Sequence, residues 1–374
     1  MRRTLFQLHL WVGLIAGLAI VALGLSGSAL VYRADIERWT AGALVHVEPM
    51  SARLSYDSLV AEALAAHPGR VLTRFRPPAA ENESLEVVLQ WPGARDLKSA
   101  QLVSVFIDPY RGAVLGSIER ASGPIWWLQD FHYALLSGVP GLRVNGFVAL
   151  LLVLLAVTGP VLWWPGKRNV RQGFRVRWRS APARWVRDLH AVGGLIASLL
   201  LIFVALTACY FAFRGVATTL IQALTGDPPL APPVVTAYED GAEFASLDAL
   251  VAAASALGPG AILDEVRPAR RPGQATSVAF RRPGEFATGR NRLYLDPRDA
   301  SVVRVDLHER LEAGQRAAAS MAAWHFGSFG GRATQAIWFV LGLVPAFLFG
   351  SGTWLWWRKR RRTAATRCDV TTNP

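Results

Sequence analysis

Cysteine and charge are both scarce in this sequence, and each scarcity argues against a class of protein. Only 2 of the 374 residues are cysteine. Cys209 lies in an apolar run and Cys368 in a basic tail, so we expect no disulfide between them. Charged residues make up 18% of the chain and hydrophobic residues 52%. This balance is too apolar for an ordinary soluble enzyme, and it predicts a membrane protein with sizeable soluble parts.

A glycine-rich dinucleotide-binding motif is also missing from the short basic segments that connect or flank the apolar runs. Such motifs bind the pyrophosphate of nicotinamide and flavin cofactors. If the protein receives electrons from such a donor, a partner therefore has to supply it.

Four long apolar runs are present, and each is long enough to cross a membrane. The first, Leu10 to Tyr32, has 23 residues, enough at about 1.5 Å per residue to span a hydrocarbon core of roughly 30 Å. The other predicted spans cover residues 145–164, 190–213 and about 336–357. They predict a bundle of four transmembrane helices.

The first run has a competing interpretation as a cleaved signal peptide. Met1-Arg2-Arg3 would form its basic start, and Ser26-Gly27-Ser28-Ala29 would supply small residues for cleavage. A similar segment recurs at residues 189–213, where no signal peptide can lie, so we favour a membrane span.

Positive charge is concentrated at the N-terminus, in the loop at residues 165–188 and in the tail after residue 357. The two long segments between the spans are nearly balanced, because residues 33–130 hold 10 cations and 12 anions and residues 214–324 hold 12 and 13. The positive-inside rule therefore predicts that both termini and the basic loop are cytoplasmic and that both soluble segments are external. The net charge of +13 is then a topology signal, and we expect no nucleic-acid partner.

Both soluble segments predict one helix and a small antiparallel sheet. In the first, a helix at residues 57–66 precedes strands at 71–75, 85–91 and 101–107, a turn at Asp108-Pro109 and a returning strand at 113–118. In the second, a helix at 247–256 precedes strands near Ile262, Thr276 and Leu293, a turn at Asp296-Pro297 and a strand at 301–305. The segments share one α+β pattern.

An internal repeat relates the two halves of the chain. An offset of 181 matches Arg3, His9, Gly13 and Arg33 with Arg184, His190, Gly194 and Arg214. An offset of 193 matches His132, Gly159, Trp163 and Trp164 with His325, Gly352, Trp356 and Trp357. Each half has two spans, an even number, so the halves are expected to be parallel and related by a two-fold axis along the membrane normal.

Four of the seven histidines lie at the ends of membrane helices, where an ionisable side chain is costly and indicates a function. Helix direction places His9 and His190 together at the cytoplasmic face and His132 and His325 together at the outer face. The remaining three, His46, His67 and His308, are interpreted as ordinary surface residues.

Two neutral imidazoles that face each other across a four-helix bundle are what the iron of a b-type haem needs for six-coordination. Gly13 and Gly194, each one turn from a histidine, would leave room for the macrocycle. Possible partners for the propionates are Arg3, Arg33, Arg184 and Arg214, although they can equally be interfacial anchors. We favour haem, with two groups per chain. Helix capping without a cofactor, a zinc site and a proton relay remain the alternatives. Ligation by two histidines leaves no open iron position, so these centres should carry electrons.

Taken together, these features resemble those of a known family. The Leu-His openings of spans one and three, Phe131-His132 with Gly138 and Gly141, the closing Thr158-Gly159-Pro160-Val161-Leu162-Trp163-Trp164 and the Asp-Pro turns are similar to the PepSY-associated transmembrane helix family of iron-regulated bacterial membrane proteins. The resemblance extends to about residue 362. It implies an inner-membrane ferric-siderophore reductase with two haems that reduces iron(III) at the periplasmic side.

Two departures separate the second half from the first. Ser351-Gly352-Thr353 stands where the first half has Thr158-Gly159-Pro160, and Ala300 stands where the first Asp-Pro turn has a glycine. We expect neither departure to contact a proposed haem ligand. We expect both to affect only the periplasmic surface and helix packing.

The sequence thus predicts an all-α four-span bundle with two extracytoplasmic α+β PepSY-like domains. The predicted segments are 1–32 (span one), 33–125 (first domain), 126–164 (interfacial helix and span two), 165–188 (basic loop), 189–213 (span three), 214–320 (second domain), 321–357 (interfacial segment and span four) and 358–374 (tail). The predicted function is reduction of a ferric siderophore or other ferric chelate, with electrons from an unidentified cytoplasmic or quinol donor. A siderophore permease and a haem-free regulatory or peptidase-inhibiting PepSY scaffold are the alternatives.

Overall fold

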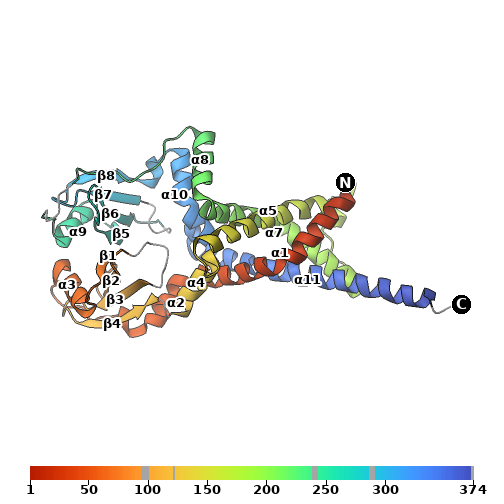
Figure 1. Ribbon diagram of the computed structural model, residues 1–374, viewed down its shortest axis with the longest axis horizontal. Coiled ribbons are helices and arrows are strands. Elements are labelled where there is room, and N and C mark those ends of the chain that lie inside the picture. The colour runs from red at the N-terminus through yellow and green to blue at the C-terminus, as the bar shows by residue number, and fades with distance from the viewer. Residues whose placement is uncertain (94–100, 121–122, 238–242, 259, 286–290, 372–374) are drawn as a thin grey trace.

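Long apolar helices form a bundle that carries a β-sheet at one end (Figure 1). The computed structural model describes residues 1–93, 101–120, 123–237, 243–258, 260–285 and 291–371, with side chains up to residue 362. In this part of the chain, four helical segments are long and apolar enough to cross a membrane. They belong to α1 (Arg2–Val31), α5 (Val139–Trp163), α7 (Pro182–Ala212) and α11 (Gly331–Thr371). The chain is therefore an integral membrane protein with the four predicted spans.

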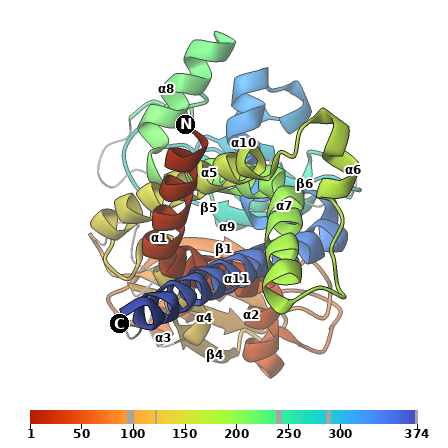
Figure 2. The ribbon, with the colours of Figure 1, turned by 90° about the vertical axis from the view of Figure 1, so that its right-hand side faces the viewer.

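The long helices pack as a four-membered bundle. Helix α1 packs against α5 and α11, and α7 packs against the same two helices, so that α1 and α7 lie at opposite corners (Figure 2). Every long helix begins before the predicted span. Polar first turns continue the helix beyond the apolar run, and Pro140 and Pro182 sit at the first positions of α5 and α7, where proline is tolerated.

Short helices connect the bundle to the sheet. These connecting helices are α2 (Arg33–Ala41), α4 (Pro124–Ala134), α8 (Arg214–Thr225) and α10 (Ala313–Phe326). The predicted interfacial helix corresponds to α4, whereas α2 and α8 were not predicted. The chain turns sharply from α4 into α5, and a Cβ on Gly141 would lie 1.8 Å from the carbonyl oxygen of Ala134. Glycine is required there because the backbones approach too closely for any side chain.

Eight antiparallel strands form one sheet in the order β4-β3-β2-β1-β5-β6-β7-β8. The strands are β1 (Val71–Arg76), β2 (Leu85–Gln90), β3 (Leu102–Ile107), β4 (Val114–Glu119), β5 (Ile262–Arg267), β6 (Thr276–Arg281), β7 (Asn291–Leu295) and β8 (Val302–Asp306). All eight agree with the predicted strands to within a few residues. The two soluble segments do not form separate sheets, because β1 pairs with β5 and Phe75 lies opposite Val266.

Two helices, α3 (Tyr56–Ala66) and α9 (Leu247–Ser255), cover the face of the sheet that points away from the bundle (Figure 1). Their apolar side chains join those of the strands in one buried core, which includes Leu59, Phe75, Leu250, Val266 and Phe280. Because successive strand residues point to opposite faces, the side chains next to Phe75 and Val266 point towards the bundle. The sheet therefore has one apolar face and one polar face.

The two Asp-Pro turns have the same geometry. Asp108 accepts hydrogen bonds from the backbone of Tyr110 (2.9 Å) and Arg111, and Asp296 accepts one from Arg298 (3.0 Å). Gly112 closes the first turn with φ +71°, and Ala300 closes the second with φ +59°. The departure noted in the sequence thus keeps the turn, although a left-handed conformation costs a residue with a Cβ roughly 1–2 kcal/mol.

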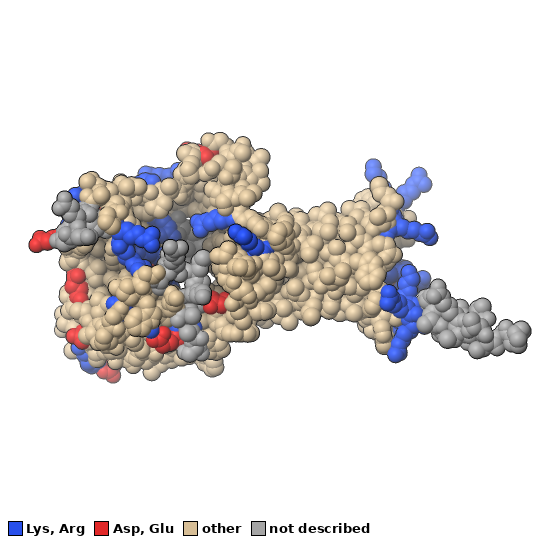
Figure 3. All heavy atoms as spheres, viewed as in Figure 1, with Lys and Arg blue, Asp and Glu red and all other residues tan. Residues whose placement is uncertain are grey.

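Arginine and lysine gather at the end of the bundle that carries both termini, and the middle of the bundle shows none on the face drawn in Figure 3. Short helical turns occur at η1 (Gly42–Val45), η4 (Lys167–Asn169), α6 (Val170–Gly173), η5 (His308–Arg310) and η6 (Ser328–Gly330). Cys209 is a free thiol on α7, and the side chain of Cys368 lies outside the described residues.

Candidate functional site

The structure brings together the two histidines predicted at the sheet end of the bundle. His132 lies on α4 and His325 on α10, and the centroids of their rings are 6.2 Å apart with the planes inclined at 44°. A metal ion between two facing imidazoles sits about 2 Å from each nitrogen, and with a ring radius of about 1 Å the centroids are then about 6 Å apart. The spacing of this pair therefore fits a metal bound by both rings.

His9 and His190 lie at the other end of the bundle, on α1 and α7. These helices occupy opposite corners, and the two imidazoles are close enough to interact electrostatically. Seventeen residues separate His9 from Ser26, the residue of α1 that contacts His132. At about 1.5 Å per residue, the two histidine sites are about 25 Å apart along the bundle.

Each of the four histidines is hydrogen-bonded to a hydroxyl on a neighbouring long helix. On the sheet side, Nδ1 of His132 lies 3.0 Å from Oγ of Ser26, and Nδ1 of His325 lies 2.9 Å from Oγ1 of Thr207. The other pair repeats this contact: Nδ1 of His9 lies 2.8 Å from Oγ1 of Thr158, and Nδ1 of His190 lies 2.8 Å from Oγ of Ser351. One kind of contact thus orients all four rings.

The hydroxyls decide which ring nitrogen is protonated. Each donates its own proton to a backbone carbonyl three or four residues earlier in its helix, as Thr158 does to Leu154 (2.8 Å) and Ser351 does to Phe347 (2.7 Å). Ser26 and Thr207 do the same to Ala22 and Val204. A hydroxyl whose proton is used can only accept, so Nδ1 of the histidine must be the donor. This assigns the tautomer in which Nε2 keeps the free lone pair that a metal needs.

Glycines give the histidines and their surroundings space. Three of the hydroxyl residues are followed by glycine, and a Cβ on Gly27 would lie 2.9 Å from Cε1 of His132. On Gly352 a Cβ would lie 3.3 Å from Cε1 of His190. At the predicted packing positions, Gly13 and Gly194, the nearest atoms to an added Cβ are leucine methyls at 3.9 Å and 3.6 Å. These are ordinary van der Waals distances, and the role of the two glycines towards a flat cofactor stays a prediction.

The four arginines predicted as possible propionate partners differ in their surroundings. Arg3, Arg184 and Arg214 are exposed. Arg33 is half-buried, because its Nε donates to Glu37 and its guanidinium lies 4.0 Å from the ring centroid of Trp126. Their role towards a cofactor stays a prediction.

Of the three histidines interpreted as surface residues, His46 is exposed. His308 is different, because its Nε2 lies 2.8 Å from Oγ of Ser320 on α10 and its backbone N–H donates to Asn291. His308 is partly exposed, and its ring also joins η5 to the helix that carries His325.

Sequence reasoning missed the four hydroxyl residues. The expectation that Ser351-Gly352-Thr353 contacts no proposed ligand is wrong, because Ser351 hydrogen-bonds to His190 and Gly352 lies against the same ring. In the sequence, Ser26 stands out only as a small residue of the possible cleavage site. The repeat contained the signal, since the offset of 181 matches Ser26 with Thr207 and the offset of 193 matches Thr158 with Ser351.

Comparison with known proteins agrees with the resemblance noted in the sequence. The protein-family model described as the PepSY-associated TM region matches residues 6–359. No curated protein matches the chain. The matched range includes all four histidines and all four hydroxyl residues.

Proposed function

The chain belongs to the PepSY-associated TM region family, and on this premise we propose that it is a membrane ferric-chelate reductase that binds two haem b groups. His9 and His190 would hold one haem, and His132 and His325 the other. The substrate would be a ferric siderophore or similar chelate, reduced on the side of the membrane where the sheet lies. In this proposal the two halves of the sheet, with α3 and α9, are PepSY-like domains.

The charge distribution supports an orientation for the protein. Lysine and arginine cluster at the bundle end that carries the termini, opposite the sheet. The positive-inside rule places that end in the cytoplasm and the sheet outside it, which is the periplasm if the membrane is a bacterial inner membrane. The sheet-side pair would then be next to the external acceptor.

The observation that carries the proposal is the sheet-side pair, with its ring centroids 6.2 Å apart and both Nδ1 atoms held by hydroxyls. The hydroxyls orient the rings and keep Nε2 free to ligate. A haem iron held by two histidines supplies one-electron transfer without an open coordination position.

The overall reaction needs one electron per iron. Iron(III) in the chelate takes one electron from a quinol or a cytoplasmic donor and becomes iron(II). Its lower charge weakens its bonds to hard oxygen ligands, and the metal is released. This chemistry requires no nucleophile or general acid from the protein.

An absorption spectrum of the purified protein tests the proposal. The oxidised and dithionite-reduced forms should show low-spin b-type bands, and extraction should recover two haems per chain. The reduced protein should then be reoxidised by a ferric chelate while iron(II) accumulates. A protein with no haem after expression in haem-replete cells would exclude the reductase and favour the haem-free scaffold.

A siderophore permease is the remaining alternative. It needs a polar pathway through the bundle, whereas the buried hydroxyls Ser26, Thr158, Thr207 and Ser351 are committed to histidines and backbone carbonyls. Uptake of the intact labelled chelate into vesicles, without iron(II) release, would support the permease.

A further inference from the structure

The centre of the sheet carries a compact group of charged side chains on the face that points towards the bundle. Arg74 and Arg76 come from β1, Glu265 and Arg267 from β5, and these strands join the two halves of the sheet. Because Phe75 and Val266 point into the core on the far side, the neighbouring residues on each strand point the other way. Glu86 of β2 and Arg120, which follows β4, complete the group.

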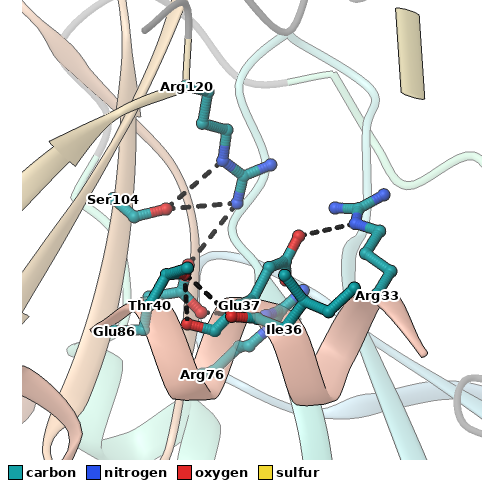
Figure 4. A network of polar contacts seen from close by, with 8 residues as sticks. All are labelled: Arg33, Ile36, Glu37, Thr40, Arg76, Glu86, Ser104 and Arg120. Atoms are coloured by element: carbon teal, nitrogen blue, oxygen red, sulfur yellow. Dashed lines mark hydrogen bonds and ion pairs between the residues drawn. The ribbon is translucent and has the colours of Figure 1, made fainter. Parts of the chain in front are cut away.

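We call these six residues the central arginine cluster. Arg76 Nη1 lies 2.8 Å from Glu86 Oε2, and Arg120 Nη2 lies 3.4 Å from Glu86 Oε1 (Figure 4). Glu265 is shared in the same way, because Arg74 Nε lies 3.0 Å from one oxygen and Arg267 pairs with the other. Each carboxylate thus serves two guanidinium groups.

Positive charge is in excess in this cluster. Four arginines share two carboxylates, and the adjacent Arg33 and Glu37 pair with each other and leave the balance unchanged. Burial, together with the charges of Arg74 and Arg76, lowers the pKa of Arg120 to about 9. Burial opposes ionisation of Glu86, yet Arg76 and Arg120 hold its pKa below the ordinary value. The cluster therefore carries about two positive charges that none of its own carboxylates neutralises.

The cluster lies close to the sheet-side histidines. The ring of buried Trp126 on α4 stands between Arg33 and Arg120, whose guanidinium carbons are each 4.0 Å from its centroid. Trp126 precedes His132 by six residues, or about 9 Å of helix. Figure 3 shows a hollow between the sheet and the bundle, with lysine or arginine side chains at its walls.

We infer that the central arginine cluster binds an anionic metal chelate, one whose carboxylate or catecholate oxygens leave the complex with net negative charge. This inference rests on the proposed function for the chelate and adds a selection by charge. Arg76 and Arg267, the more exposed members, would donate charge-assisted hydrogen bonds to the chelate. A cationic chelate would be repelled.

Binding of gallium(III) citrate to the full-length protein in detergent tests this without any electron transfer, because gallium(III) is not reduced under these conditions. We expect saturable binding by calorimetry that weakens steeply with added salt. Arg76→Gln and Arg267→Gln should each weaken binding about tenfold, the typical effect of losing one charge-assisted hydrogen bond. Arg298→Gln is the matched control, because it removes an arginine of the turn between β7 and β8 that pairs with Asp296 outside the cluster.

A cationic gallium(III) trihydroxamate gives the second arm and should bind at least tenfold more weakly than the citrate chelate. Equal binding of both chelates, no binding of the citrate chelate, or equal losses in the cluster variants and Arg298→Gln would overturn the inference. If a glutamine variant fails to fold, Arg76→Lys is used in its place. It keeps the charge but loses the paired donors of the guanidinium, so citrate binding should weaken and stay salt-dependent, whereas citrate binding that salt does not weaken would overturn the inference. Haem content is measured on the same samples: haem without citrate binding refutes only the cluster, and citrate binding without haem refutes only the reductase.

Discussion

The smallest repeated unit of this molecule is a histidine with its hydroxyl partner. Four times, a serine or threonine on a neighbouring long helix accepts from Nδ1 and donates to its own backbone. A hydrogen bond donated by Nδ1–H makes the imidazole more electron-rich, and such a ligand favours the oxidised metal. The hydroxyls are therefore expected to set the reduction potential as well as the orientation of each ring.

Ser351→Ala tests this at a single residue. Loss of the acceptor should raise the midpoint potential of the haem that we propose His190 to bind, and weaken haem retention about tenfold, the lower end of the usual effect of removing such a partner. A spectroelectrochemical titration measures the potential.

Ser198→Ala is the control for this substitution. Ser198 is also a buried serine of a long helix, and its hydroxyl donates to the carbonyl of Leu195 without contacting a histidine. If both variants shift the potential equally, or neither does, the hydroxyl has no role in tuning the site.

The residue scale also shows what the sequence could not reveal. His9, His132, His190 and His325 were identifiable because ionisable groups at span ends are rare and these four repeat. Ser26 and Ser351 were not, because small hydroxyl residues are common in membrane helices and bond to their own backbone wherever they occur. The repeat matches these positions, and the packing of α1 against α4, and of α7 against α11, shows that their hydroxyls face a ring.

At the scale of elements, α3 and α9 hold each other in place. Asp57 accepts from the backbone N–H groups of Leu247 (3.1 Å) and Asp248 (3.4 Å) at the start of α9. Asp248 accepts in the same way from Tyr56 and Asp57 at the start of α3. Each helix thus caps the N-terminus of the other, and the contact joins the two halves of the chain across the core.

Asp57→Ala should destabilise the domain by about 1 kcal/mol, the usual effect of losing a helix cap. Asp57→Asn should cost less, because the amide oxygen still accepts a hydrogen bond while the repulsion between the two carboxylates is removed. Asp57→Ala combined with Asp248→Ala should cost less than the sum, since the two side chains form one contact.

Thermal unfolding of the full-length protein, followed by intrinsic fluorescence, measures these changes. Glu62→Ala, at an exposed position of α3, controls for the loss of an acidic residue from the same helix. A midpoint that falls equally in Glu62→Ala and Asp57→Ala would contradict the capping role.

Elements were predictable from the sequence where the pattern is local. Strands alternate polar and apolar residues, and the Asp-Pro turns mark their ends, so all eight strands were placed. The amphipathic helix α8 was missed because it follows directly from the apolar run of α7. The pairing of β1 with β5 could not be predicted either, because the sequence around Phe75 or Val266 does not indicate which strand, about 190 residues away, will pair with it.

At the scale of the whole molecule, the repeat places equivalent sites at equal distances. Seventeen residues separate His9 from Ser26 on α1, and seventeen separate His190 from Thr207 on α7. Both helices therefore contact the two histidine pairs with the same axial spacing. Neither pair shares a hydroxyl or a ring with the other, so each is expected to assemble on its own.

His9→Ala should therefore remove one of two haems and leave the other, and His132→Ala should remove the second and leave the first. The two variants should retain haems with different midpoint potentials, because one pair is packed between α1 and α7 and the other beside α4 and α10 under the sheet. Haem extraction and redox titration of both variants measure this, with exposed His46→Ala retaining two haems as the control.

Loss of both haems from either single variant would show that the pairs assemble together, and retention of both in His9→Ala would show that α1 and α7 hold no haem. If each variant keeps one haem but neither reduces a ferric chelate with a quinol donor, both sites are needed for electrons to cross the membrane, as the spacing along α1 and α7 requires.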